Sequence, residues 1–308
     1  MESSTTTSDI DKCSTWLTEY SRDTYSQFGE DGVIEKALEL IGETDGWCVE
    51  FGAWDGLHLS NTANLIKNKG YKGVLIEADS QRVQELNSNY SKASDVHILS
   101  GFVGWTEKDG LDVLLKPTPI PKDFDFLSVD IDGNDFHVWN AVDHYRPKLV
   151  LIEFNPTIPT DVDFVQPSDP AISHGASGLA LTKLGARKGY DLVHVSRTNL
   201  LFVDHKYFDR FGIRSASFRD MRIDDTDVTW IFTGYDGTIL LSGKRKMHFH
   251  GIPIRQKKMQ VLPKYLRSFP TNYSSLQKAA RKIFRIVAGR SIDQTHLKSS
   301  DFLESREA

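Results

Sequence analysis

The chain has 308 residues, of which 39% are hydrophobic and 26% charged, so it can form a globular core. Its net charge of −5 gives no reason to expect nucleic acid as a partner, because phosphate binding needs clustered positive charge. Two cysteines are too few for a disulfide framework, the polar first residues do not resemble a signal peptide, and no run approaches the roughly 18 apolar residues of a membrane span, so we expect a cytoplasmic protein.

Short apolar runs alternate with helix-like stretches through the first half of the chain. Apolar residues at helical spacing predict a first helix over 31–41. The runs that follow are Trp47–Phe51, Gly73–Glu77, Val96–Leu99, Phe126–Val129 and Leu149–Ile152, with helices predicted over 60–69, 81–90 and 134–145. This alternation indicates a doubly wound α/β fold with a mostly parallel sheet, whose ligands bind beyond the carboxyl ends of the strands.

The pattern changes after Asn155, where four prolines predict a loop that is long enough to be a lid or a substrate loop. A helix (179–188) and two strands (191–195 and 200–203) complete the sheet, and a hairpin (228–233 and 238–242) surrounds a Tyr-Asp-Gly turn. An amphipathic basic helix over 273–287 is expected to be a solvated helix that packs on the domain, rather than one that contacts membrane or RNA. The predicted regions are a flexible segment (1–24), the main domain (25–205), an appended hairpin region packing on it (206–262) and a basic helical tail (263–308).

A cofactor site is predicted at three successive strand ends. The first strand ends in Glu50-Phe-Gly-Ala-Trp-Asp-Gly56, where Gly52 and Gly56 let the backbone turn tightly against a ligand. A carboxylate at this place suits a cationic amine and repels the pyrophosphate of a dinucleotide. Glu77 ends the second strand, where it can bind ribose hydroxyls, and Phe102 follows the third, where it can frame an adenine ring. Together these residues favour a nucleoside-type cofactor.

Acidic and amide side chains follow the fourth and fifth strands. Asp130 and Asp132 come after the fourth, Glu153 and Asn155 end the fifth, and neighbouring strand ends bring these four together. Hard oxygen ligands at this density suit Mg²⁺, which would lower the pKa of a substrate hydroxyl. Two other interpretations stay open: Asp132 and Asn134 cap the next helix, or Asp130 orients the nucleophile without a metal.

Histidines in the predicted strand-end loops are candidates for a general base, because an imidazole pKa lies near neutrality. His174, in the proline-rich loop, is our first choice over His58 and His137. For each of them a surface or structural role is the competing interpretation. Before the first helix, Ser26-Gln-Phe-Gly-Glu-Asp31 is interpreted as a helix cap, with closure over the cofactor as a secondary role.

Four of these motifs resemble the FkbM-like family of S-adenosylmethionine-dependent methyltransferases. They are Val49–Asn61, Gly73–Asp79, Leu127–Asp135 and Leu151–Pro156, and the similarity spans about 25–203. The resemblance implies a seven-stranded class I methyltransferase (Rossmann-like) fold and methyl transfer, usually to an oxygen of a small molecule. It also implies that Glu50, Gly52 and Gly56 line the methionine part of the cofactor, Glu77 the ribose, and that Asp130 lies beside the acceptor.

The function expected from the sequence is therefore O-methylation of a small-molecule hydroxyl with S-adenosylmethionine, with Mg²⁺ as an open addition. One alternative is a metal-dependent glycosyltransferase that uses Asp130 and Asp132 to hold a sugar nucleotide, although this leaves Glu50 and Glu77 without a role. Another is a catalytically silent module that keeps the fold for binding. The expected partner is a small-molecule acceptor, with no nucleic acid, no membrane span and a homo-oligomer left open.

Overall fold

The computed structural model of the protein describes residues 13–42, 44–215 and 217–292. The chain divides into two compact units, Met1–Asp225 and Thr226–Ala308. The boundary predicted after residue 205 therefore falls inside the first unit. Part of the segment predicted to be flexible is structured, since η1 (Trp16–Tyr20) is a short 3₁₀ helix with two buried side chains. Residues 1–12 of the predicted flexible segment lie outside the described residues, as does 293–308 of the predicted tail.

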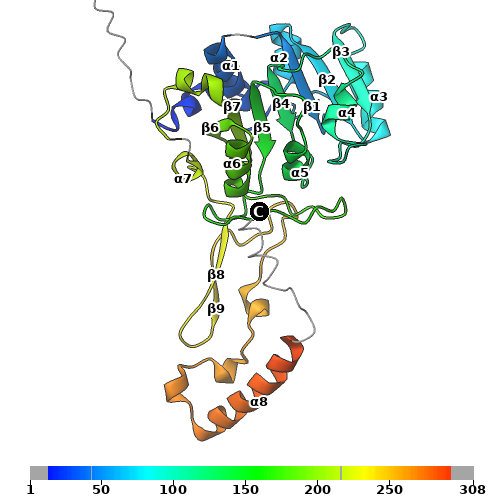
Figure 1. Ribbon diagram of the computed structural model, residues 1–308. Coiled ribbons are helices and arrows are strands. Elements are labelled where there is room, and N and C mark those ends of the chain that lie inside the picture. Colours follow the sequence, from blue (N-terminus) through cyan, green and yellow to red (C-terminus); the bar gives the residue numbers. More distant parts are fainter. Residues whose placement is uncertain (1–12, 43, 216, 293–308) are drawn as a thin grey trace, which may run out of the picture. The chain divides into compact units, whose positions relative to one another are not determined.

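The first unit is built on a seven-stranded sheet with strand order β3-β2-β1-β4-β5-β7-β6 (Figure 1). β7 runs antiparallel to both of its neighbours, and all other pairs are parallel. The strands are β1 (Trp47–Phe51), β2 (Lys72–Glu77), β3 (Val96–Ser100), β4 (Phe126–Val129), β5 (Leu149–Glu153), β6 (Tyr190–Val195) and β7 (Asn199–Asp204). The predicted doubly wound, mostly parallel seven-stranded sheet is confirmed.

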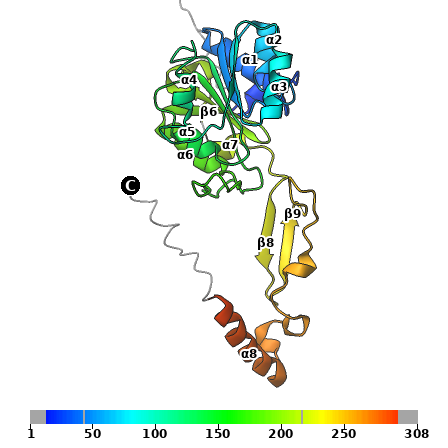
Figure 2. The same ribbon diagram turned by 90° about the vertical axis from the view of Figure 1, so that its right-hand side faces the viewer.

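Helices cover both faces of this sheet. Figure 2 shows α1, α2 and α3 on one side and α4, α5 and α6 on the other. Their bounds, with those of the remaining helices of the unit, are α1 (Glu30–Ile41), α2 (Ala63–Lys69), α3 (Ser80–Asn89), α4 (Leu111–Leu115), α5 (Asp135–Asn140), α6 (Gly178–Arg187), η2 (His205–Phe211) and α7 (Phe218–Met221). The central strands β1, β4 and β7 are buried along their whole length, as expected for a sheet covered on both faces.

Two helices are shorter than predicted. In each, residues at one predicted end donate hydrogen bonds to a carboxylate from another part of the chain. α2 begins at Ala63 rather than at residue 60, because the segment before it binds the side chain of Glu50. α5 ends at Asn140 rather than at residue 145, because the carboxylate of Asp112 accepts hydrogen bonds from three successive backbone N–H groups, at residues 143 to 145. The short helix α4 was not predicted.

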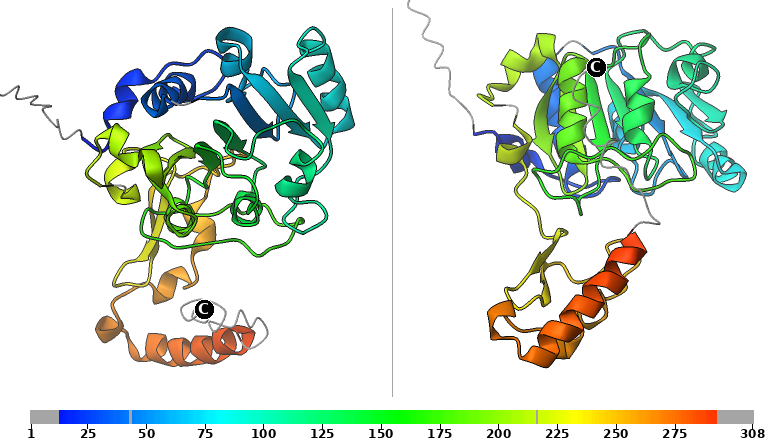
Figure 3. Two further views of the ribbon diagram at one scale, coloured as in Figure 1. Left: turned by 45° about the horizontal axis from the view of Figure 1, so that its top comes forward. Right: turned by 60° about the horizontal axis from the view of Figure 1, so that its bottom comes forward.

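The second unit contains the predicted hairpin and a long terminal helix. β8 (Thr229–Thr233) and β9 (Ile239–Gly243) pair antiparallel, and η3 (Gln256–Met259), η4 (Lys264–Leu266), η5 (Pro270–Asn272) and α8 (Ser275–Ile292) follow. Figure 3 shows α8 as one continuous helix. Within the ranges that the structure describes, no helix is both long and apolar enough to span a membrane.

Candidate functional site

The strand order reverses between β1 and β4, which makes their carboxyl ends the switch point of the sheet. Ligands of open α/β sheets bind in the crevice at such a point. Gly52 directly follows β1 and has a φ of +73°. A side chain at this position would collide with the backbone carbonyl of Asp130, which follows β4. The glycine is therefore what allows the two strand ends to approach each other, as the tight turn predicted here requires.

The loop after β1 is fastened to the end of β2 by Glu77. One carboxylate oxygen of Glu77 accepts a hydrogen bond of 2.8 Å from the backbone N–H of Trp54, and the other accepts one of 2.8 Å from that of Asp79. Gly56 closes the loop with a φ of +74°, and a side chain there would collide with Leu86 of α3. Glu77 thus lies at the predicted strand end, and among the described residues each of its oxygens accepts one hydrogen bond.

Glu50 is buried and bound to the segment before α2. Its Oε2 accepts hydrogen bonds from the hydroxyls of Ser60 (2.6 Å) and Thr62 (2.7 Å), and its Oε1 accepts one from the N–H of Asn61 (2.8 Å). Burial raises the pKa of Glu50 despite these three donors. The side chain of Asn61 donates to Ser128 of β4, while its Oδ1 is buried without a partner in the described structure. No role was predicted for the side chain of Asn61 from the sequence.

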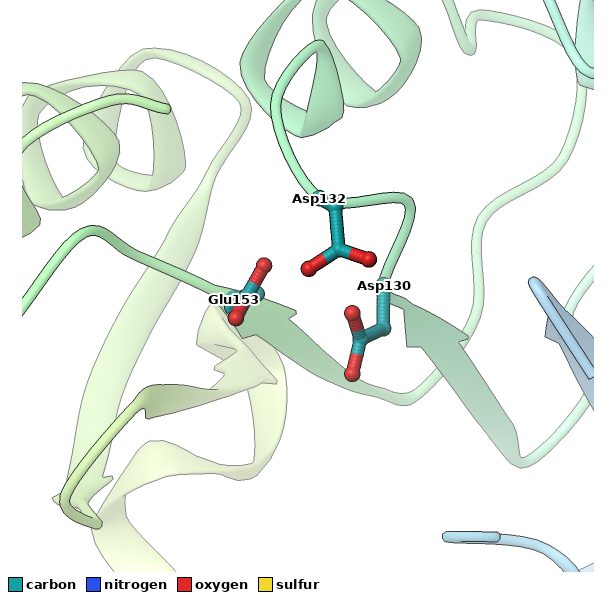
Figure 4. Close-up of side chains that lie close together, drawn as sticks. All are labelled: Asp130, Asp132 and Glu153. Carbon is teal, nitrogen blue, oxygen red and sulfur yellow. The ribbon is translucent and has the colours of Figure 1, made fainter. Parts of the chain in front are cut away.

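Three of the predicted metal ligands lie together (Figure 4). One carboxylate oxygen from each of Asp130, Asp132 and Glu153 lies within 4.8 Å of the other two. Burial raises the pKa of Asp130 and of Glu153 well above the usual range, and the neighbouring carboxylates add to both shifts. Mutual repulsion of this kind is relieved by a shared proton or by a cation. The donor set, three carboxylates with room for water on the exposed Asp132, is one that Mg²⁺ accepts.

Asp135 shapes the turn that presents Asp132. Its two carboxylate oxygens accept hydrogen bonds of 2.9 Å from the N–H groups of Ile131 and Gly133, and Asp132 between them has a φ of +55°. Asn134 occupies the N-cap position of α5 but makes no capping hydrogen bond with its side chain. The capping interpretation is therefore wrong for Asn134, because its amide is used in contacts with the loop after β5.

Two further buried carboxylates belong to the start of α1. Glu30 Oε1 accepts hydrogen bonds from Ser196 Oγ (2.6 Å) and Asn199 Nδ2 (2.7 Å), while its Oε2 has no partner in the described structure. Asp31 Oδ2 accepts three backbone N–H bonds from residues 24 to 26, and its Oδ1 is likewise unpartnered there. Burial raises the pKa of Glu30 to about 7, and the negative charge of Glu30 in turn raises the pKa of Asp130. The interpretation of Ser26–Asp31 as a helix cap did not predict this electrostatic interaction between Glu30 and Asp130.

The proline-rich loop after β5 is ordered around the buried side chain of Gln166. Its Oε1 accepts hydrogen bonds from the N–H groups of His174 and Gly175, and its Nε2 donates to Asn134. Asn155 Nδ2 donates to the carbonyl of His174, and Asn155 Oδ1 accepts two hydrogen bonds from residue 157. Asn155 is therefore occupied in holding the loop. His174 itself is exposed, and Gln166 is a residue that sequence reasoning did not identify.

Phe102 lies just beyond β3 with half of its surface (50%) exposed. The N–H of the preceding Gly101 donates to the backbone carbonyl of Glu77, which ties this segment to the end of β2. The predicted residues thus lie at or just beyond the carboxyl ends of four adjacent strands, β3, β2, β1 and β4, and β5 adds Glu153. Their contacts with a cofactor remain a prediction.

No protein-family model matches the chain, and no curated protein matches its sequence. Among similar solved structures is the N-terminal domain of EvdMO1 with SAH bound, at 11% identity, covering 58% of this chain and 82% of that one with a TM-score of 0.40. Another is a SAM dependent methyltransferase from Aquifex aeolicus, at 14% identity over 55% and 87% of the chains with a TM-score of 0.34. A third is the glycopeptide N-methyltransferase MtfA complexed with S-adenosyl-L-methionine, at 13% identity over 58% and 94% with a TM-score of 0.35. The FkbM-like resemblance stays a prediction from the sequence.

Proposed function

We propose that this protein is an S-adenosylmethionine-dependent methyltransferase that methylates a hydroxyl oxygen of a small molecule. The observation that supports this most is the concentration of carboxylates at the switch point of the sheet. Oxygens of Asp130, Asp132 and Glu153 lie within 4.8 Å of one another at the ends of β4 and β5. Burial raises the pKa of Asp130, and the charges of neighbouring carboxylates, Glu30 and Glu50 among them, raise it further. A cationic sulfonium and an α-amino group would favour the ionised forms of these carboxyls and be stabilised by them, whereas the diphosphate of a sugar nucleotide would be repelled by them.

Each residue has a role in this proposal. The turn from Gly52 to Gly56 would line the methionine part of the cofactor, Glu77 would accept hydrogen bonds from the ribose hydroxyls, and Phe102 would cover the adenine. The acceptor oxygen attacks the methyl carbon as the carbon–sulfur bond breaks and its electron pair stays on sulfur. The hydroxyl proton leaves to a base, for which Asp130 and the exposed His174 are the candidates.

We also propose that Mg²⁺ assists the reaction. Asp130, Asp132 and Glu153 would hold the ion, and Asn155 would not, because its amide oxygen already accepts two hydrogen bonds from residue 157. When bound, the ion would lower the pKa of the acceptor hydroxyl. The three carboxylates would then be ionised rather than protonated, because the positive charge offsets their mutual repulsion.

Calorimetric titration with S-adenosylmethionine, S-adenosylhomocysteine and uridine diphosphate glucose tests the cofactor. We expect the first two to bind and the Glu77→Gln variant to bind them about tenfold more weakly, since it loses charge-assisted hydrogen bonds to the ribose. The exposed Glu107→Gln variant is the matched control and should bind like the wild type. Because Glu77 also fastens the loop at Trp54, thermal unfolding of both variants is compared. Binding of the sugar nucleotide alone would refute the proposal.

The metal is tested separately with Mn²⁺, whose free concentration is read by electron paramagnetic resonance. Asp130→Asn and Glu153→Gln should each lose the bound ion, while the exposed Asp123→Asn retains it. Mg²⁺ should compete with Mn²⁺ for the wild-type site. Equal Mn²⁺ binding by all the variants, or methyl transfer that persists unchanged in a chelator, would remove the metal from the proposal and leave the cofactor proposal standing.

A further inference from the structure

The charge of the chain is divided very unevenly between its two units. Residues 226–308 contain fifteen Lys and Arg and six Asp and Glu, which gives a net charge of +9. Residues 1–225 contain 22 Lys and Arg and 36 Asp and Glu, which gives a net charge of −14. Over 226–292 the imbalance is stronger, with thirteen basic residues and two acidic ones, Asp227 and Asp236. The mild overall charge of −5 conceals this division. A unit so basic attracts polyanions.

The apolar residues of α8 form a stripe that the structure leaves exposed. Leu276, Ile283 and Val287 are spaced by seven and four residues, which places them on one side of the helix. Their surfaces are 84%, 64% and 62% exposed, and the neighbouring Ile286 is 52% exposed. Phe284, on the adjoining side, is partly buried. The helix therefore packs along Phe284 and leaves its aliphatic stripe to solvent.

The basic residues of α8 lie opposite this stripe. Lys278, Arg281, Lys282 and Arg285 recur at spacings of three and four residues, and all four are exposed. The two carboxylates in the described part of this unit are engaged elsewhere, Asp227 with Lys244 and His248, and Asp236 with residue 238. The positive charge of the helix is therefore available to an external anion.

We propose that α8 binds the surface of a bilayer that contains anionic lipids and lies in its interface. An exposed aliphatic stripe backed by Lys and Arg is the pattern of helices that bury one face among acyl chains while the charges contact the headgroups. RNA would use the charges but has no place for an Ile and Val stripe. This inference is independent of the proposed cofactor, because it uses only residues 226–292.

Sedimentation of the full-length chain with lipid vesicles tests this proposal. We expect it to pellet with vesicles of phosphatidylcholine mixed with phosphatidylserine, far less with phosphatidylcholine alone, and less again as salt is added. Ile283→Ser combined with Val287→Ser should lower the partition coefficient by about tenfold or more, since both side chains lose their contact with acyl chains. Lys282→Gln combined with Arg285→Gln should lower it by about fivefold per charge removed.

Matched controls lie on the first unit. Ile223, which is 69% exposed, is replaced by Ser, and the exposed Lys92 and Lys108 by Gln, and these variants should pellet like the wild type. Circular dichroism verifies that every variant keeps its helix content. Equal pelleting of the α8 variants would overturn the proposal. RNA binding without vesicle binding would also overturn it. A third contrary result is a dimer that light scattering detects and that Ile283→Ser abolishes, while vesicles bind no protein.

Discussion

Replacing Glu30 with Gln should remove a cost to folding that grows with pH. Glu30 begins α1 and is only 2% exposed. Burial raises its pKa from 4.5 to about 7, although hydrogen bonds from Ser196 and Asn199 oppose the shift. Between these two values the folded state holds a proton that the unfolded state has lost. Stability therefore falls as pH rises through this window.

The size of the effect follows from the shift. Between about pH 5 and about pH 8, linkage predicts that Glu30 lowers the free energy of unfolding by about 2.5 kcal/mol. Gln keeps the acceptor for Ser196 and Asn199 and cannot ionise, so the variant should lack this loss. Urea unfolding of both proteins at the two pH values gives the comparison. Glu39→Gln, on the exposed side of α1, is the control and should change with pH as the wild type does.

The result that would refute this reasoning is a stability difference between wild type and Glu30→Gln that is the same at both pH values. It would mean that Glu30 is ionised in the fold and that its environment is not the carboxylate-rich one described here. Proton release is a second readout, and it links this prediction to the cofactor. Binding of S-adenosylmethionine should release protons near neutral pH, because its positive charge lowers the pKa of the buried carboxyls.

Three other substitutions test separate parts of the structure. Gly52→Ala should destabilise the fold by about 1–3 kcal/mol in urea unfolding and abolish cofactor binding in calorimetry, because the new methyl group meets the carbonyl of Asp130 at a positive φ. Lys148→Met should cost about 3–5 kcal/mol, because Asp125, which is 0% exposed, loses its 2.8 Å ion pair; unchanged urea unfolding would contradict this. Burial lowers the pKa of His194 from 6.5 to about 4. The free energy of unfolding should therefore fall by about 3 kcal/mol in total as pH falls through this range, and His194→Gln should reduce that fall.

The strands were predictable because burial on both faces leaves a continuous apolar run in the sequence. β4 was predicted residue for residue over Phe126–Val129, and β1 over Trp47–Phe51. The helix ends were less predictable, because they depend on contacts between distant residues. Hydrogen bonds to Glu50 displace the start of α2, and hydrogen bonds to Asp112 displace the end of α5. The local spacing of apolar residues does not reveal that these two carboxylates lie beside the helix ends.

The candidate site also contains some residues that could be predicted from the sequence and others that could not. Asp130 and Glu153 could be placed together from the sequence, since adjacent parallel strands end at one edge of the sheet. The contribution of Glu30 could not, because it depends on contacts with Ser196 and Asn199, which are 166 and 169 residues away in the chain. The role of Gln166 was hidden for another reason. A proline-rich loop has no periodicity, so nothing in its pattern shows which side chain it is folded around.

Transfer of a methyl group inside cells tests the central claim most directly. Metabolites from cells that express the wild-type chain are compared by mass spectrometry with those from cells expressing Asp130→Asn or Glu77→Gln, grown with methyl-labelled methionine. We predict at least one small molecule that is heavier by one CH₂ group and carries the label in the wild-type cells, and that both variants diminish. A metabolite that instead gains a sugar, or an unaltered metabolite profile while the expressed chain fails to bind S-adenosylmethionine, would contradict the proposed function.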